Sequence, residues 1–253
     1  MPDSAGNARR QQYLRAMQVD VWQRRESPAA ASPPGAAQGS AVPAPAPAAV
    51  EGSDGAAFSV SVASMPLAEL ESTVSHCRRC ELHKGRNTTV FGTGAQDADC
   101  MIIGEAPGAD EDARGEPFVG RAGRLLNAML RAMGMTREAV YIANIVKCRP
   151  PKNRDPKPEE MVSCAPYLRR QIAVVRPRVI LAVGRIAAQH LAGSTSPIGR
   201  MRGQSYYYEN SDEGIRIPVV VTYHPAYLLR SPQAKAKAWD DLCLVKGLLS
   251  DSR

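Results

Sequence analysis

The sequence contains few aromatic residues and no long apolar run. Phe, Trp and Tyr make up 5% of its 253 residues, and only three of them are phenylalanines. A membrane-spanning helix needs roughly 20 apolar residues in succession, and the N-terminal stretch MPDSAGNARRQQ lacks the apolar centre of a secretory signal. We therefore expect a cytoplasmic protein that does not enter a membrane.

Acidic residues are too few to balance the basic ones. The 32 Lys and Arg residues exceed the 25 Asp and Glu residues, which gives a formal net charge of +7. A basic excess favours an anionic partner such as nucleic acid, but an excess of this size does not identify one. The apolar fraction of 44% is sufficient for a packed core.

The N-terminal part of the chain lacks large apolar residues. Residues 28 to 57 are mostly Ala, Pro, Ser and Gly, which bury too little surface to offset the entropy of ordering the chain. We therefore expect a disordered linker at residues 28–65 and a main domain at residues 66–250.

A short helical pattern precedes this linker. Residues 11–25 place Leu14, Met17 and Trp22 at roughly helical spacing among arginines. An isolated helix of this length is marginally stable in water. Two interpretations follow: a docking helix within residues 1–27 that folds against a partner protein, or a helix that packs on its own domain.

Strand and helix patterns alternate beyond the linker. Apolar runs predict buried strands, and amphipathic runs predict helices. The predicted strands are 98–104, 140–146, 178–184, 205–209 and 215–222, and the predicted helices are 66–74, 121–134, 158–175, 185–191 and 232–249. This alternation implies right-handed crossovers and a three-layer α-β-α sandwich around a mostly parallel sheet.

Two motifs rich in Gly and Pro follow predicted strands. The run Gly104 to Gly108 reads GEAPG, and His224-Pro225 follows the last strand. Such turns alone are weak signals, but ligands bind at the carboxyl ends of strands in these sheets, and the long polar loop after GEAPG favours binding. A phosphate loop is the weakest alternative, because GEAPG lacks the Lys-Ser/Thr ending.

Three side chains near these motifs are candidates for ligand contacts. Phe118 lies in the polar loop, where its ring either stacks on a planar base or caps the core. Asn144 interrupts an apolar strand and offers a donor and an acceptor, either to a ligand or to a neighbouring loop. His224 is either structural or catalytic, and Pro225 fixes the direction of its side chain.

Four of the six cysteines form a pattern typical of a metal centre. Cys77 and Cys80 make a C-x-x-C pair, and Cys148 and Cys164 follow singly. Disulfides are rare in a reducing cytoplasm, so zinc and an iron-sulfur cluster are the open alternatives. Either would tie the helix before Cys77 to the sheet, which is a structural role. The other two, at 100 and 243, lie in apolar patterns and are expected to be core thiols.

Taken together, GEAPGADED, the Asn in YIANIVKCRPP, HPAYLLR and the four cysteines resemble the family 4, iron-sulfur uracil-DNA glycosylases of bacteria and archaea. The resemblance covers roughly residues 66–250. It implies the uracil-DNA glycosylase fold and an enzyme that flips uracil out of DNA and hydrolyses its glycosidic bond without cutting the strand. It also implies that a 4Fe-4S cluster, with zinc as the weaker alternative, is held by Cys77, Cys80, Cys148 and Cys164.

The same resemblance implies a uracil pocket formed by Gly104, Glu105, Ala106, Phe118, Asn144 and His224. Phe118 would stack on the flipped base, Asn144 would hydrogen-bond its edge, and His224 would face O2. A better-known branch of the superfamily has a water-positioning Asp where this chain has Ala106. Glu105 is then the candidate for that role or for stabilising the cation, with Asn144 and His224 as the other catalytic residues. Alternatively, the Glu105 side chain is structural and only the backbone of Glu105 and Ala106 contacts uracil.

DNA contacts are expected from the HPAYLLR motif. Leu228 or Leu229 would fill the gap left by the flipped base, with Arg230 near a phosphate, or both leucines are ordinary core residues. The segment Lys147 to Arg154 contains no His, which argues for ordinary turnover and against covalent attachment to DNA. We expect a monomer.

One alternative belongs to a different class of protein. A non-catalytic, metal-containing DNA-binding protein would recruit a replication or repair protein through residues 11–25. The presence of both Asn144 and His224 argues against it, because binding alone does not need them.

Overall fold

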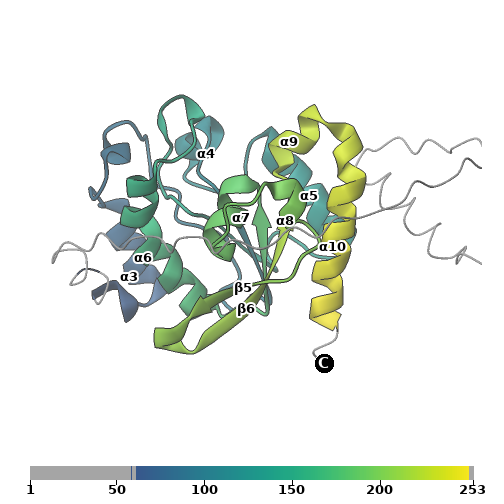
Figure 1. Ribbon diagram of the computed structural model, residues 1–253. Helices are drawn as coiled ribbons and strands as arrows, with labels where there is room; N and C mark the ends of the chain where they lie inside the picture. The colour runs from purple at the N-terminus through teal and green to yellow at the C-terminus, as the bar shows by residue number, and fades with distance from the viewer. Residues whose placement is uncertain (1–57, 59–60, 251–253) are drawn as a thin grey trace, which may run out of the picture.

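The computed structural model describes Phe58 and residues 61–250 (Figure 1). The predicted docking helix, and the predicted linker up to residue 57, lie outside the described residues. The end of the predicted linker is wrong, because Val62 is 1% exposed and the Phe58 ring packs edge-on against the Tyr167 ring, with centroids 5.6 Å apart. The apolar side chains of 58 and 62 therefore join the domain before residue 66.

Six strands form one sheet in the order β1-β3-β2-β4-β6-β5. The central strands β2, β3, β4 and β6 pair in parallel, and the edge strands β1 and β5 pair antiparallel. The strands are β1 (Thr93–Gly94), β2 (Cys100–Gly104), β3 (Tyr141–Asn144), β4 (Val179–Val183), β5 (Tyr206–Asn210) and β6 (Ile215–Thr222). This arrangement confirms the predicted mostly parallel sheet.

Helices cover both faces of the sheet and complete the predicted three layers (Figure 1). One face packs on α3 (Leu67–Ser75), α6 (Pro158–Val175), α7 (Arg185–Ala192) and α8 (Ile198–Met201), and the other on α5 (Arg121–Met133), α9 (Pro225–Arg230) and α10 (Lys235–Ser250). Alternate residues of β2 serve the two cores: Met101 and Ile103 face the first, and Cys100 and Ile102 the second. This is the period of two expected of a buried strand.

Two short helices lie where the sequence predicts loops. The first, α4 (Ala109–Arg114), begins after Gly108, whose N–H donates to Glu111 Oε2 at 3.1 Å. The second is α9, with Pro225 in its first turn. Each spans six residues, too few for a helical period to be recognised in the sequence. Both lie at the top of Figure 1.

Two other expectations also differ from the structure. The last helix begins at Lys235, after a 3-10 turn at Pro232–Ala234, instead of at residue 232. Cys243 is exposed on α10 and is not the core thiol expected, whereas Cys100 is buried. Among the helices that the structure describes, none is long and apolar enough to cross a membrane.

Parallel pairing brings the carboxyl ends of the central strands to one edge of the sheet. Gly104 at the end of β2 lies opposite Asn144 at the end of β3, and Val183 of β4 lies opposite Thr222 of β6. GEAPG, Asn144 and His224 therefore meet at this edge, although they come from distant parts of the chain.

Candidate active site

Four of the predicted pocket residues lie within contact distance of one another. A Cβ atom added to Gly104 would lie 2.4 Å from Asn144 Oδ1 and 2.7 Å from Phe118 Cζ. The Phe118 ring in turn faces the His224 ring, with centroids 5.7 Å apart and planes inclined by 31°. Only glycine at 104 lets the Asn144 amide and the Phe118 ring approach the end of β2 this closely.

Asn144 is buried, and its side-chain oxygen has no partner among the residues that the structure describes. The residue is 2% exposed, and Oδ1 accepts no hydrogen bond from any described residue. A buried polar atom left unpaired costs about 1–3 kcal/mol, so such atoms are rare unless they have a function. Asn144 Oδ1 is therefore suited to accept a hydrogen bond from a bound ligand.

His224 is held as a neutral hydrogen-bond donor. Its Nδ1 caps α9 by accepting a hydrogen bond from the Ala226 N–H at 3.1 Å. Desolvation, assisted by the positive charge of Arg230, lowers the pKa of His224 to about 4. A neutral imidazole whose Nδ1 accepts must carry its proton on Nε2. His224 therefore presents an N–H group without a net charge.

Phe118 adopts a backbone conformation that bulky residues avoid. Its φ angle is 53°, in the left-handed region, and the residue is only 6% exposed. A Cβ atom on Gly123 would lie 1.7 Å from the Phe118 carbonyl oxygen, so the start of α5 approaches this loop through a glycine. The ring belongs to the second core, as one of its two interpretations expects, and it also faces His224.

Glu105 titrates near neutral pH. Desolvation, followed by the negative charge of Asp155, raises the pKa of Glu105 to about 7, while Arg185 opposes the rise. Arg185 also forms an ion pair with Asp155 at 2.5 Å. Neither partner is identifiable in the sequence, because each comes from a different segment. Ala106, by contrast, has no polar side-chain atom and packs against the first core.

The HPAYLLR motif separates into core and surface residues. Leu228 is 1% exposed and belongs to the second core, so the prediction that it contacts DNA is wrong. Leu229 is 37% exposed, and Arg230 is also exposed. Successive residues of α9 point in different directions, and only the structure shows which leucine faces outward.

The four predicted metal ligands line a single cavity. Cys77, Cys80, Cys148 and Cys164 line it together with side chains such as Val74 and Tyr167. Burial raises the pKa of the thiols of Cys80, Cys148 and Cys164, the last to about 12. Within the described ranges, no three His, Cys, Asp or Glu side chains are grouped closely enough to hold one metal ion.

Two hydrogen bonds to sulfur oppose the effect of burial and would stabilise thiolates in this cavity. Arg86 Nη1 donates to Cys148 Sγ at 3.0 Å, and the Lys147 N–H donates to Cys164 Sγ at 3.3 Å. The Lys147 ammonium is buried and donates to Asn144 O at 2.8 Å. Lys147 therefore links the cysteine cavity directly to the strand end that carries Asn144.

Comparison with known proteins agrees with this geometry. A sequence model described as the uracil DNA glycosylase superfamily matches residues 91–243, and the chain belongs to this superfamily. It is 44% identical over 179 residues to a type-4 uracil-DNA glycosylase of Archaeoglobus fulgidus. The alignment covers 69% of this chain and 89% of that protein. It is 41% identical over 187 residues to a type-4 uracil-DNA glycosylase of Pyrobaculum aerophilum. That alignment covers 72% of this chain and 94% of that protein. Within the superfamily the chain belongs to the type-4 family, as its motifs predict.

Replacing Gly104 with alanine tests whether the placement of Asn144 and Phe118 beside it forms the base-binding site. The added methyl group would lie 2.4 Å from Asn144 Oδ1 and 2.7 Å from Phe118 Cζ and would displace them, so we expect uracil release from a single-uracil oligonucleotide to fall about 100-fold. Gly247→Ala is the matched control, because its Cβ atom would meet nothing within 4 Å. Activity of Gly104→Ala equal to that of the control would show that the base does not bind there.

Proposed function

We propose that this protein is a monofunctional uracil-DNA glycosylase that acts in DNA repair. The observation that carries the proposal is the oxygen of buried Asn144, which has no partner among the described residues and lies next to Phe118, whose ring faces His224. Uracil offers what this group of side chains lacks: its N3–H is a donor for Asn144 Oδ1, and its flat ring matches an aromatic ring. A base inside a duplex cannot reach such a pocket, so uracil enters it by flipping out of the stack.

The reaction breaks the bond between uracil N1 and the sugar C1′. The bonding electrons leave with uracil, so negative charge develops on its O2 while the sugar becomes cationic. We assign to the His224 Nε2–H the role of donating to O2, where the hydrogen bond strengthens in the transition state. The pKa of about 4 keeps His224 neutral under physiological conditions, so its Nε2–H acts as an uncharged donor.

We assign Glu105 to the sugar side of the reaction. Its carboxylate either orients the water that attacks C1′ or stabilises the cation electrostatically. The water oxygen bonds to C1′ and gives up a proton, and the departing uracil anion gains one, which leaves an abasic site and free uracil. Gly104 and Ala106 contribute backbone to the same pocket. No lysine is assigned a role as a nucleophile, and strand cleavage is not expected.

We propose that Cys77, Cys80, Cys148 and Cys164 hold a 4Fe-4S cluster. A cavity lined by all four thiols and the donors on Arg86 and Lys147 support this, because hydrogen bonds to sulfur stabilise negatively charged thiolates. When bound, the cluster serves as a structural brace between the segment of Cys77 and Cys80 and the end of β3. The Lys147 ammonium lies beside this centre and holds the Asn144 carbonyl.

DNA contacts in this proposal come from the exposed part of α9. Leu229 and Arg230 follow His224 within one short helix, so a leucine to fill the gap in the duplex and a cation for a phosphate lie beside the pocket. A partner protein that binds residues 11–25 remains our hypothesis for the N-terminal part of the chain. A role in binding alone offers no reason for the unpaired Asn144 oxygen or the neutral His224.

Removing either polar pocket residue should abolish catalysis without preventing folding. We expect Asn144→Ala and His224→Ala each to slow uracil release from a single-uracil duplex by at least about 100-fold, because each removes a hydrogen bond to the reacting base. Release is measured with anaerobically purified protein by cleaving the abasic sites with alkali. His190→Ala is the control, since this histidine lies on α7 outside the pocket. No release by the wild-type protein would instead support the recruiting protein.

The rate should depend on pH through Glu105. Its raised pKa means that the carboxylate forms only as pH rises through about 7, so we expect single-turnover rates to fall about tenfold per unit below pH 7. His224 stays neutral down to about pH 4 and adds no inflection in this range. Glu105→Gln should lower the plateau and remove the inflection. A rate for the wild type that is constant from pH 5 to 8 would exclude an ionised Glu105 from the mechanism.

The metal content of the protein tests the cluster. We expect about four iron and about four acid-labile sulfide per chain after anaerobic purification, and loss of both in Cys148→Ser or Cys164→Ser. Cys243→Ser, which alters an exposed thiol on α10, should retain full content. About one zinc per chain without sulfide would identify the alternative centre.

A further inference from the structure

The loop that carries Phe118 turns through the left-handed region and forms an anion-binding nest. In a nest, consecutive backbone N–H groups point the same way and bind one anion. Glu111 Oε1 fills this nest, accepting hydrogen bonds from the N–H groups of Val119 and Gly120 at 3.0 and 3.1 Å. Its other oxygen accepts from the Gly108 N–H at 3.1 Å. Glu111 therefore joins the loop to the end of the GEAPG motif.

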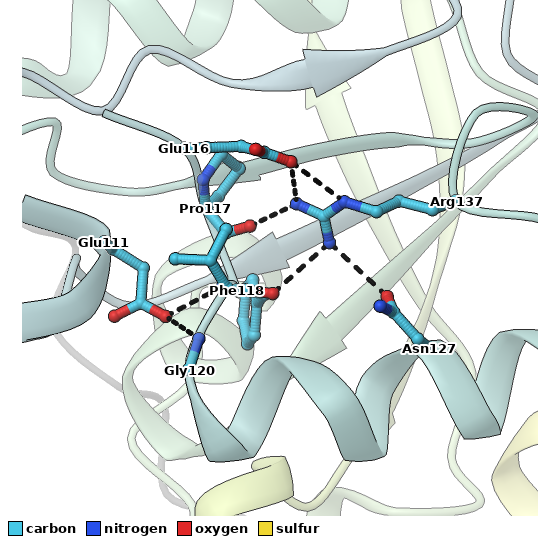
Figure 2. A network of polar contacts seen from close by, with 8 residues as sticks. Glu111, Glu116, Pro117, Phe118, Gly120, Asn127 and Arg137 are labelled. Carbon is cyan, nitrogen blue, oxygen red and sulfur yellow. Dashed lines mark hydrogen bonds and ion pairs between the residues drawn. The ribbon is translucent and has the colours of Figure 1, made fainter. Parts of the chain in front are cut away.

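A cation binds the carbonyl groups of the same loop. Arg137, in the connection between α5 and β3, donates to the carbonyl oxygens of Pro117 and Phe118, the latter at 3.4 Å. It also donates to Glu116 Oε1 at 2.9 and 3.2 Å, and to Asn127 Oδ1 on α5 at 3.5 Å. Figure 2 shows the guanidinium and the nest-filling carboxylate on opposite sides of the loop. The Glu111 carboxylate thus binds the backbone N–H groups of this loop, and the Arg137 guanidinium binds the carbonyl groups of the residues just before them.

This arrangement accounts for the conformation of Phe118. A positive φ is unfavourable for a bulky residue, and it persists only where its surroundings determine it. The Arg137 side chain is 16% exposed, so its bonds to the loop are largely shielded from water and charge-assisted. Without the guanidinium, the carbonyl groups at 117 and 118 lose their shared donor. The loop is then free to relax, and the Phe118 ring loses its fixed place beside His224.

We propose that Arg137 is a positioning residue for the base pocket, an inference that rests on the proposed function. Arg137 does not touch the base. It holds the Phe118 backbone in the left-handed conformation that sets the ring as the wall on which the flipped uracil stacks. Its loss should therefore weaken recognition of the base itself and leave recognition of the DNA backbone unchanged.

The test compares Arg137→Met with Arg178→Met. Arg178 is a matched control because it also binds a carboxylate, Asp99 at 3.5 Å, and a carbonyl, Leu249 O at 2.9 Å, but lies at the opposite, amino-terminal end of β4. In Arg137→Met we expect KM for a single-uracil duplex, and the inhibition constant of free uracil, each to rise about tenfold, with a smaller change in kcat. Binding of a duplex with a tetrahydrofuran abasic analogue, which carries no base, should stay within about twofold.

A conservative variant and chemical rescue separate positioning from general destabilisation. Arg137→Lys keeps the charge but loses the fork of donors, so we expect an intermediate inhibition constant. Methylguanidinium should partly restore uracil binding in Arg137→Ala and have no effect on Arg178→Met. If Arg137→Met does not fold, as judged by its thermal midpoint, the Lys variant decides in its place. Unchanged inhibition by free uracil in the folded Arg137 variants would overturn the proposal.

Failure of this inference is distinguishable from failure of the proposed function. If the wild-type protein neither releases uracil nor is inhibited by it, the proposed function fails. If the wild type is active and Arg137→Met behaves as Arg178→Met does, only the role of Arg137 fails.

Discussion

Parallel pairing of the four central strands is the constraint on which the site depends. Because β2, β3, β4 and β6 run in the same direction, their carboxyl ends form one edge, where Gly104 lies opposite Asn144 and β6 leads into His224. Of the pocket residues, only Phe118 comes from a loop at a distance from a strand end. β2, β3 and β4 are buried along their whole length, so the positions of the residues at their ends are set by the packing of the core.

The environment of each pocket residue gives it a particular chemical state. Desolvation keeps His224 neutral and raises the pKa of Glu105 to about 7, and the buried Asn144 oxygen has no partner in the part of the chain that the structure describes. These effects share a cause, since each group is withdrawn from water at the end of a buried strand. The pocket therefore combines an uncharged donor, a free acceptor and a carboxylate that titrates near neutral pH.

Support for the pocket comes from two sides. Lys147 joins the cysteine cavity to the Asn144 strand end, with its ammonium between Asn144 O and Gln171 Oε1 at 2.8 and 2.6 Å. Arg137 and Glu111 hold the Phe118 loop on the opposite wall. Both supports use charged groups shielded from water, where hydrogen bonds are strong and the loss of one partner is costly.

The sequence by itself determined the layered α/β fold, the bounds of α6, the motifs of the pocket and the four cysteines, because these depend on local periodicity and on short runs of residues. It did not determine the role of side chains in short elements. Only the structure showed that α4 and α9 are helices, that Leu228 is buried and Leu229 exposed, and that Phe58 joins the core. The contacts of Arg137 and Asp155 likewise depend on tertiary structure. Such contacts join residues far apart in the chain, and a pattern of neighbouring residues does not predict them.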